Sequence, residues 1–287
     1  MFDPAATFPR IARTLPWNGR GHAPCQEIRI GTVGLGGPDP VIIGGPCAVE
    51  SREQLLALAR EVKQAGGQML RGGAFKPRTS PYSFQGLGLQ GLDFLAEARA
   101  ETGLPIVTEV MDPRLIERVG EVADLLQVGC RSMQNFPLLM ELGRQPRPVL
   151  LKRGFCSTLE EWLGAAEYIA KGGNDRIVLC ERGIRSFTAG EYARNTSDIN
   201  VVQPVLASTR LPLIFDPSHS TGDAALVPSV ARAALAAGVH GLLVEVRTPA
   251  TPPESLLSDG LQAVTPGTLA EIVRFARWIR DWRESEQ

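Results

Sequence analysis

The stretch RPVLLKRGFCSTLEEWLGAAEYIAKGGNDRIVLCERG, residues 147–183, decides the fold class. Two short apolar runs, 147–154 and 175–183, flank a segment whose apolar residues recur at helical spacing. Continuous apolarity is typical of strands that are buried on both faces. Ser157 and Glu160 stand at capping-box spacing, which predicts the start of the helix. The stretch therefore predicts a strand, a crossover helix and a second, parallel strand.

The same unit repeats along the chain without a linker or a break in composition. Six further apolar runs are predicted strands: 40–45, 68–75, 104–110, 124–129, 211–219 and 241–246. Helix-period segments separate them, of which 195–208 is the least regular. Eight such units predict an α/β fold, a (β/α)8 TIM barrel over residues 40–287, with a doubly wound open sheet as the alternative. Residues 1–39 form an N-terminal extension, and QEIRIGTVGLGG within it is a candidate hairpin capping one end of the barrel.

Composition narrows the class of protein. Of the 287 residues 44% are hydrophobic and 21% charged, which is typical of a globular protein with a large core. The net charge of −1 argues against nucleic acid or an anionic membrane as partner. No apolar run approaches a membrane span, and the first residues lack the pattern of a signal peptide, so we expect a cytoplasmic protein. Five scattered cysteines indicate reduced thiols.

Cationic residues follow several predicted strands at their carboxyl ends, where a barrel builds its active site. They are Arg71, Lys76, Arg78, Arg131, Lys152 and Arg182. Cations that converge in one cleft repel one another unless an anion lies between them, and Arg matches phosphate and carboxylate oxygens. The pattern predicts a ligand with two phosphates, or two phosphorylated ligands. The alternative is a set of solvated loop charges paired with helix carboxylates.

A second set of strand-end residues combines soft and hard metal ligands. Cys47, His219, Glu245 and Asp259 offer a thiolate, an imidazole and two carboxylates. These donors suit one divalent ion of manganese, iron, cobalt or zinc. Their spacing is not that of a compact metal motif, so a buried core thiol and a structural histidine remain the alternatives.

The strand-end motifs resemble those of a known enzyme family. They are GGPCAVES, LRGGAFKPRTSPYSFQGLG, TEVMD, QVGCRSMQNF, PVLLKRG, GNDRIVLCERGIRSF, DPSHSTG and LSDG. In this order, from about residue 40 to 262, they resemble the 3-deoxy-D-arabino-heptulosonate 7-phosphate synthases of the type I-beta group. The resemblance implies a metal-dependent condensation of phosphoenolpyruvate with erythrose 4-phosphate, the first step of the shikimate pathway, in a homo-oligomer.

The resemblance also implies a role for each site residue. The metal ligands would be Cys47, His219, Glu245 and Asp259. Phosphoenolpyruvate would be held by Arg71, Lys76, Arg131, Lys152 and Arg182. Arg78 and Thr79 would hold the aldose phosphate, and Asp216 would complete the substrate-binding set. Lys76 would also move protons or polarise the aldehyde, together with Cys47 and His219 at the catalytic centre.

Departures from the family pattern keep alternatives open. The segment after Glu245, EVRTPATPPES, replaces EVHPDP and lengthens the connection to Asp259. Cys130 and Ser132 flank Arg131, and Ser197 replaces a leucine. The KPRTS motif argues against the related synthases of an eight-carbon acid sugar, and Cys47 against their metal-independent members. The same chemistry on another aldose phosphate, or a non-catalytic phosphate-binding barrel, remains possible on the sequence alone.

Overall fold

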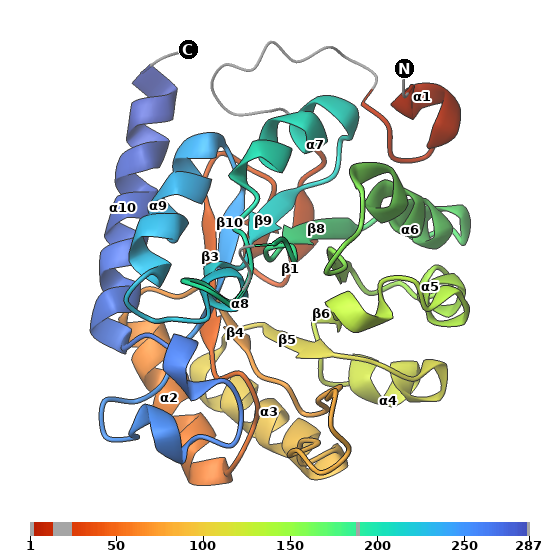
Figure 1. The fold of residues 1–287 in the computed structure, drawn as a ribbon. Helices are drawn as coiled ribbons and strands as arrows, with labels where there is room; N and C mark the ends of the chain where they lie inside the picture. The colour runs from red at the N-terminus through yellow and green to blue at the C-terminus, as the bar shows by residue number, and fades with distance from the viewer. Residues whose placement is uncertain (1–2, 14–24, 188–189, 286–287) are drawn as a thin grey trace.

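Eight parallel strands close into a barrel in the computed structural model, which describes residues 3–13, 25–187 and 190–285 (Figure 1). The strands are β3 Val41–Gly45, β4 Met69–Arg71, β5 Ile106–Glu109, β6 Leu125–Val128, β7 Val149–Lys152, β8 Ile177–Glu181, β9 Leu213–Phe215 and β10 Gly241–Glu245. Pairing of β10 with β3, from Gly241 on Val41 to Glu245 on Gly45, closes the ring. The predicted (β/α)8 barrel is confirmed, and the open-sheet alternative is wrong.

Helices cover the outside of the barrel in chain order (Figure 1). They are α2 Arg52–Gln64, α3 Leu89–Thr102, α4 Ile116–Gly120, α5 Phe136–Leu142, α6 Leu159–Lys171, α7 Val202–Ser208, α9 Val227–Ala237 and α10 Pro266–Ser285. The short helix α8, Pro217–Thr221, instead follows β9 directly at the carboxyl end of the barrel. The predicted capping box is displaced by one residue. Thr158 is the N-cap of α6, because it has the extended backbone that an N-cap requires. It forms the capping box with Glu161, in which each side chain accepts a hydrogen bond from the backbone of the other residue.

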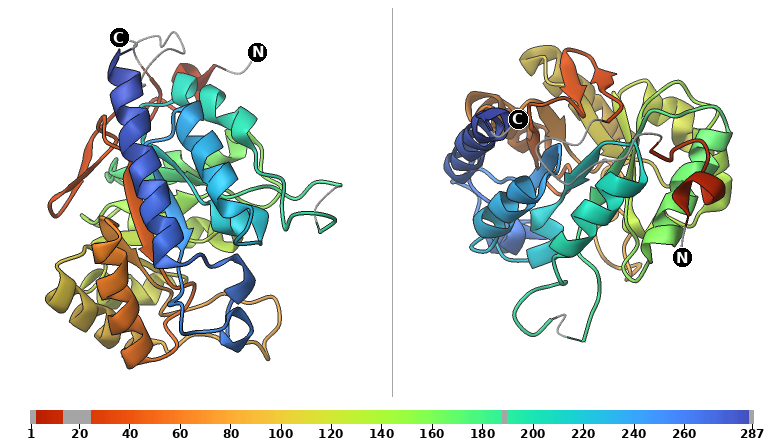
Figure 2. Two further views of the ribbon diagram at one scale, coloured as in Figure 1. Left: turned by 90° about the vertical axis from the view of Figure 1, so that its left-hand side faces the viewer. Right: turned by 90° about the horizontal axis from the view of Figure 1, so that it is seen from above.

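A hairpin closes the amino-terminal end of the barrel. Strands β1, Ile28–Ile30, and β2, Val33–Leu35, pair antiparallel as the sequence predicted. Their four apolar side chains pack in one cluster with interior residues of the barrel strands, such as Ile43 and Leu243. In the left view of Figure 2, the hairpin and the loops at the carboxyl ends of the strands lie on opposite sides of the molecule. The hairpin therefore seals one end and leaves the other for a site.

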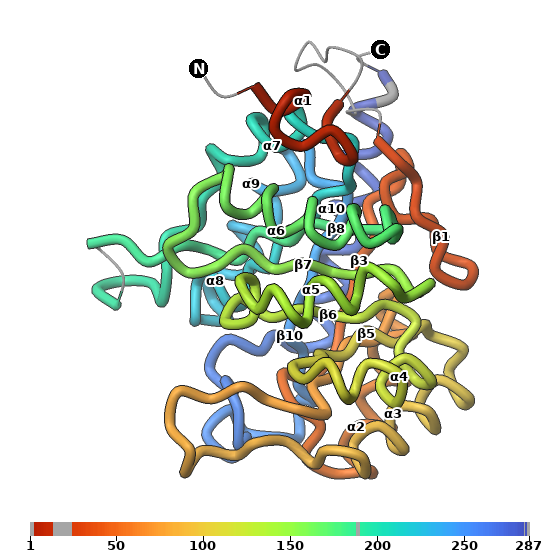
Figure 3. Tube along the Cα trace, turned by 90° about the vertical axis from the view of Figure 1, so that its right-hand side faces the viewer, coloured from red at the N-terminus to blue at the C-terminus, as the bar shows by residue number. Residues whose placement is uncertain are grey.

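The first described residues lie against the outer helices. Helix α1, Pro4–Thr7, lies near α6 and α7 (Figure 3). The backbone of Arg10 donates to Glu167 of α6, and that of Arg13 donates to the carbonyl of Ser208 at the end of α7. Among the described residues, no helix has the length and apolar character needed to cross a membrane.

Candidate active site and metal centre

The four predicted metal ligands meet at the carboxyl end of the barrel. Cys47 follows β3, Glu245 ends β10, His219 lies in α8, and Asp259 lies in the loop before α10. One donor atom of each side chain lies within 4.8 Å of the others. Cys47 Sγ is 3.3 Å from Asp259 Oδ2, and His219 Nε2 is 3.3 Å from Glu245 Oε1. The closing register of β3 on β10, which pairs Gly45 with Glu245, brings the first and last of these strands together.

The protonation of this group suits a divalent transition metal. Burial lowers the pKa of His219 to about 4, so the imidazole is neutral at pH 7, as a metal ligand must be. Burial, reinforced by Glu245, raises the pKa of the Cys47 thiol to about 12. That thiol therefore needs a strong positive charge beside it to become a thiolate. Sulfur, nitrogen and two carboxylate oxygens together fit manganese, iron, cobalt or zinc.

Lys76 contacts the same thiol. Its Nζ lies 3.1 Å from Cys47 Sγ and 3.2 Å from the Cys47 carbonyl oxygen. Burial opposes protonation of Lys76, but the neighbouring Cys47 raises its pKa above the usual value. The site therefore holds an ammonium group with protons available next to the proposed metal.

Asp216 orients His219 from behind. Its Oδ2 accepts from His219 Nδ1 at 2.7 Å and from Lys152 Nζ at 2.6 Å. Because Nδ1 points to a carboxylate, it carries the proton and leaves Nε2 free to face Glu245. Asp216 is fully buried and is not among the residues that line the neighbouring cavity, and its expected place in the substrate-binding set stays a prediction.

Two loop residues that the sequence analysis did not single out connect the carboxylates. Gln262 donates from Nε2 to Glu245 Oε2 at 2.6 Å. Arg194 donates from Nη1 to Asp259 Oδ1 at 3.0 Å and to Gln262 Oε1 at 2.9 Å. Arg194 belongs to the RNTSD motif, which is the only sequence signal that could have indicated it. These contacts fix two of the proposed metal ligands relative to each other.

A cavity of about 260 Å³ opens beside the predicted metal ligands, and His219 and Asp259 are among the residues that line it. Seven lysine and arginine side chains line it against two carboxylates, those of Glu109 and Asp259. The cations are Arg71, Lys76, Arg78, Arg131, Lys152, Arg182 and Arg194. All six cations predicted from the sequence thus line one cavity, and this excess of positive charge favours an anionic ligand.

The cations differ in depth. Four of them are buried: Arg71, Lys76, Lys152 and Arg182. Arg78 is half-buried, while Thr79 and Arg131 are exposed, with Arg131 Nη2 3.4 Å from Thr79 Oγ1. The cavity therefore has a desolvated inner part beside the metal ligands and an open outer part that contains Thr79.

Aromatic and polar side chains complete the walls. The guanidinium carbons of Arg131 and Arg182 lie 5.2 and 4.9 Å from the ring centroid of Phe155, at cation–π distance. Gln127 donates to Glu109 Oε2 at 3.1 Å, and burial raises the pKa of Glu109. Glu109 Oε1 is buried without a hydrogen-bond partner among the described residues. Phe155 and Gln127 carried no assigned role in the sequence analysis, because an aromatic and an amide at strand ends are not distinctive.

Other strand-end charges lie outside the cavity. Arg153 pairs with Glu181 at 2.9 Å and with Asp198 at 2.7 Å, all three away from the cavity wall. The charges of these three residues therefore neutralise one another, which is the arrangement that the alternative of paired loop charges describes. Arg71, Lys152 and Arg194 also pair with carboxylates, those of Glu245, Asp216 and Asp259, but they line the cavity as well.

Comparisons with family models and with known proteins point to the same family. The model of the DAHP synthetase I family matches residues 23–284. A phospho-2-dehydro-3-deoxyheptonate aldolase of Thermotoga maritima is 47% identical over 260 residues, which cover 91% of this chain and 75% of the relative. A 2-dehydro-3-deoxyphosphooctonate aldolase of Syntrophotalea carbinolica is 32% identical over 83% of this chain and 90% of the relative.

Solved structures agree. A crystal structure of the Thermotoga maritima phospho-2-dehydro-3-deoxyheptonate aldolase (DAHP synthase) superposes with a TM-score of 0.85 at 45% identity. It covers 94% of this chain and 79% of the other. A truncated 3-deoxy-D-arabino-heptulosonate 7-phosphate synthase from the same organism gives a TM-score of 0.84 at 40% identity, over 96% and 97% of the two chains. The chain belongs to the DAHP synthetase I family.

Proposed function

We propose that the protein condenses phosphoenolpyruvate with erythrose 4-phosphate to give 3-deoxy-D-arabino-heptulosonate 7-phosphate and inorganic phosphate. The observation that carries this proposal is the adjacency of the Cys47, His219, Glu245 and Asp259 cluster to the seven-cation cavity. A metal centre beside an anion-binding cavity suits a reaction between an aldehyde and a phosphorylated enol. The 47% identity to the Thermotoga maritima enzyme supports the same reaction.

The cavity offers separate positions for the two substrates. Arg71, Lys152 and Arg182 are buried and would hold the phosphate and carboxylate of phosphoenolpyruvate, with Lys76 and Arg131 at its edges. The outer part, with Arg78 and Thr79, would hold the phosphate of the aldose. This arrangement directs the enol carbon of one substrate toward the aldehyde carbon of the other and converts an encounter in solution into a reaction between neighbours.

The bond changes follow from the substrates. Carbon 3 of phosphoenolpyruvate attacks the aldehyde carbon, water adds at carbon 2, and the phosphate leaves by cleavage of its bond to carbon 2. When bound by the four ligands, a divalent metal supplies Lewis-acid polarisation of the aldehyde carbonyl. Lys76 would donate a proton toward the developing alkoxide, since its ammonium group lies beside the cluster. The buried guanidinium and ammonium groups hold the anions away from bulk water.

The same reaction on another aldose phosphate is the second candidate. The segment 247–255 differs from the family pattern, and it leads into the LSDG motif, in which Ser258 accepts a hydrogen bond from Arg78 at 2.7 Å. A change in this segment can therefore reach a residue proposed to bind the aldose. The two 32% identical relatives named 2-dehydro-3-deoxyphosphooctonate aldolase support this second candidate.

The proposal also covers the metal ion, the oligomeric state and the cellular location of the protein. We propose one manganese, iron, cobalt or zinc ion per chain, on the donor chemistry given above. The exposed Trp278 and Trp282 of α10 form an apolar surface that supports assembly into a homo-oligomer. We assign catalysis to residues 40–287, treat residues 1–39 as an extension, and place the protein in the cytoplasm.

A panel assay tests the substrate assignment. Metal-loaded protein is incubated with phosphoenolpyruvate and, separately, erythrose 4-phosphate, ribose 5-phosphate or arabinose 5-phosphate, and inorganic phosphate is measured. Release with erythrose 4-phosphate at a kcat/KM at least tenfold above the five-carbon sugars is expected. Release only with a five-carbon sugar supports the second candidate, and no release from metal-loaded protein with any sugar contradicts both.

A further inference from the structure

Asp259 occupies an unusual backbone conformation for its residue type. Its φ of 54° and ψ of 34° lie in the left-handed region, and it is the only non-glycine residue with positive φ in the described part of the chain. For a residue with a side chain, this conformation is unfavourable and persists where neighbouring contacts impose it. The contacts that hold the segment before Asp259 therefore act together with Arg194, which binds the carboxylate directly, to position that carboxylate.

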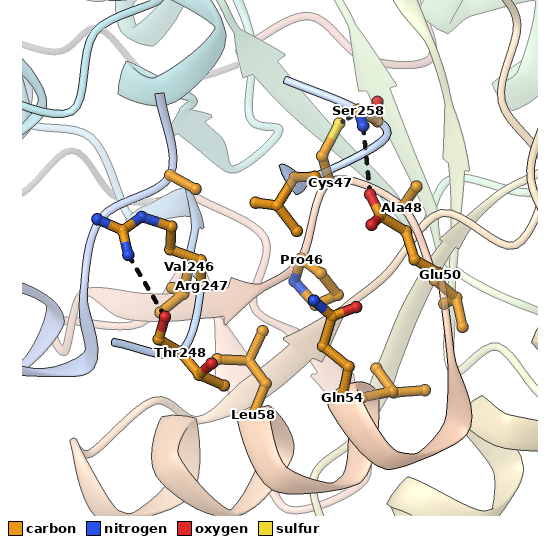
Figure 4. A pocket seen from close by; sticks show the side chains of 14 residues that line it. Pro46, Cys47, Ala48, Glu50, Gln54, Leu58, Val246, Arg247, Thr248 and Ser258 are labelled. Atoms are coloured by element: carbon orange, nitrogen blue, oxygen red, sulfur yellow. Dashed lines mark hydrogen bonds between the residues drawn. The ribbon is translucent and has the colours of Figure 1, made fainter. Parts of the chain in front are cut away.

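Glu50 makes two of these contacts. It follows the Cys47 loop and precedes Ser51, the N-cap of α2. Its Oε1 accepts the backbone N–H of Leu257 at 2.9 Å and that of Ser258 at 3.2 Å. Figure 4 shows the Glu50 carboxylate directed at Ser258, next to Cys47. One carboxylate from the β3 loop thus fixes the two residues that immediately precede Asp259.

The side chain of Ser258 then contacts both halves of the site. Its Oγ lies 3.2 Å from Cys47 Sγ and accepts from Arg78 Nη1 at 2.7 Å. Ser258 is buried, so these contacts are formed away from water. A shift of Ser258 would move Asp259 relative to Cys47 and would also release Arg78, a residue proposed to bind the aldose phosphate.

The rest of the contact between this segment and α2 is largely apolar. Leu256 and Ala263 line a small space of about 20 Å³ together with Leu55 and Leu58 of α2, with room for about one water molecule. Apolar packing holds the segment close but is not directional. The two hydrogen bonds to Glu50 therefore supply the orientation that packing alone does not give.

We propose that Glu50 is a positioning residue, which seats Ser258 and Asp259 over Cys47 and so sets both the metal affinity and the affinity for the aldose phosphate. This inference rests on the proposed metal-dependent function. Glu50 itself lies outside the substrate cavity and is not one of the four metal ligands, so it acts through the segment that it holds.

The test is a cobalt titration of the full chain after removal of bound metal. The absorption of a cobalt–thiolate bond reports Cys47 directly and does not depend on turnover. Glu50→Ala is expected to weaken cobalt binding by about 10- to 100-fold, the usual effect of removing a partner of a metal ligand. Glu50→Gln keeps an acceptor oxygen for both amides and is expected to stay within about threefold of the wild type. Glu254→Ala, an exposed acid in the same segment, is the matched control and should bind as the wild type.

Steady-state kinetics supply the second readout. At saturating metal, Glu50→Ala should raise the KM for erythrose 4-phosphate at least about tenfold more than the KM for phosphoenolpyruvate, because Ser258 contacts Arg78. If Glu50→Ala does not fold, Glu50→Asp replaces it, since the shorter side chain cannot reach both amides. Wild-type binding and kinetics in a folded Glu50→Ala or Glu50→Asp protein would overturn the inference and leave the proposed function intact. Failure of the wild type itself to bind any of the four metals would overturn the proposed function and the inference together.

Discussion

The exchange of Asp216 for Asn perturbs the metal site through a single buried oxygen. Asp216 Oδ2 accepts from His219 Nδ1 and from Lys152 Nζ, and Oδ1 accepts from the His219 backbone at 2.9 Å. An Asn amide offers one acceptor oxygen where the carboxylate offers two. Lys152 loses its buried counter-charge in either orientation of the neutral amide. If the amide nitrogen faces His219 Nδ1, the imidazole also loses its acceptor and its proton moves to Nε2, where it blocks metal binding.

This substitution should lower both the metal affinity and the stability of the protein. Loss of the correct imidazole tautomer weakens metal binding by about 10- to 100-fold, which corresponds to about 1.4–2.7 kcal/mol. Breaking a buried ion pair by removal of one partner costs about 3–5 kcal/mol of stability, reduced here by the acceptor that Asn retains. We therefore expect Asp216→Asn to fold with a loss of about 1–3 kcal/mol and to bind metal at least tenfold more weakly.

Metal titration and urea denaturation measure these two effects on the same samples. Asp112→Asn is the control, since Asp112 also lies at the carboxyl end of the barrel but pairs with the exposed Arg114. Asp216→Asn with the metal affinity of the wild type would refute the orientation of His219 by Asp216. The same affinity loss in Asp112→Asn would show that the effect is not specific to the pair.

Three further predictions follow from the geometry. His219 has a depressed pKa in the folded state, so its protonation favours unfolding. As the pH falls from about 6.5 to about 4, the metal-free wild type should lose about 3 kcal/mol of stability relative to His219→Gln. If urea denaturation gives the same dependence of stability on pH for both proteins, the burial argument is contradicted. Leu35→Ala, in the hairpin that closes the other end of the barrel, should cost about 2–5 kcal/mol in urea denaturation without changing kcat, and a large change in kcat would show that the hairpin reaches the site. Arg78→Ala should raise the KM for the aldose phosphate by about 10- to 100-fold with a much smaller effect on phosphoenolpyruvate, and equal effects on both substrates would contradict their assignment to separate parts of the cavity.

The barrel could be predicted because its strands are buried on both faces. Side chains of β7 and β8 pack either inside the barrel or under the helices, so both runs are apolar throughout, and a helix separates each pair of strands. The first residue of α6 was harder to predict from the sequence. Ser157 and Thr158 are adjacent, and each stands three residues before a glutamate, so only the backbone conformation distinguishes the N-cap. Local sequence fixes the type of an element more firmly than its first residue.

The candidate site was partly predictable for the same reason. Residues at strand ends, such as Lys152 and Glu245, converge by the topology of the barrel. Side chains that come from long loops do not: Arg194 and Ser258 reach the cluster only because their loops fold back over the mouth. The substrate-binding role of Asp216 stays a prediction, and its place at the carboxyl end of the barrel agrees with the topology. Asp216 is the N-cap of α8, which turns its carboxylate behind His219 and away from the cavity.

Carbon–carbon bond formation is the central claim, and isotope tracing tests it most directly. Metal-loaded protein is incubated with erythrose 4-phosphate and phosphoenolpyruvate that carries ¹³C at carbon 3, and the products are followed by ¹³C NMR. The account predicts that the label moves into the methylene carbon of a seven-carbon keto acid phosphate, with one inorganic phosphate released per labelled product. Recovery of the label in pyruvate, or its persistence in phosphoenolpyruvate with metal bound to the four ligands, would contradict the account.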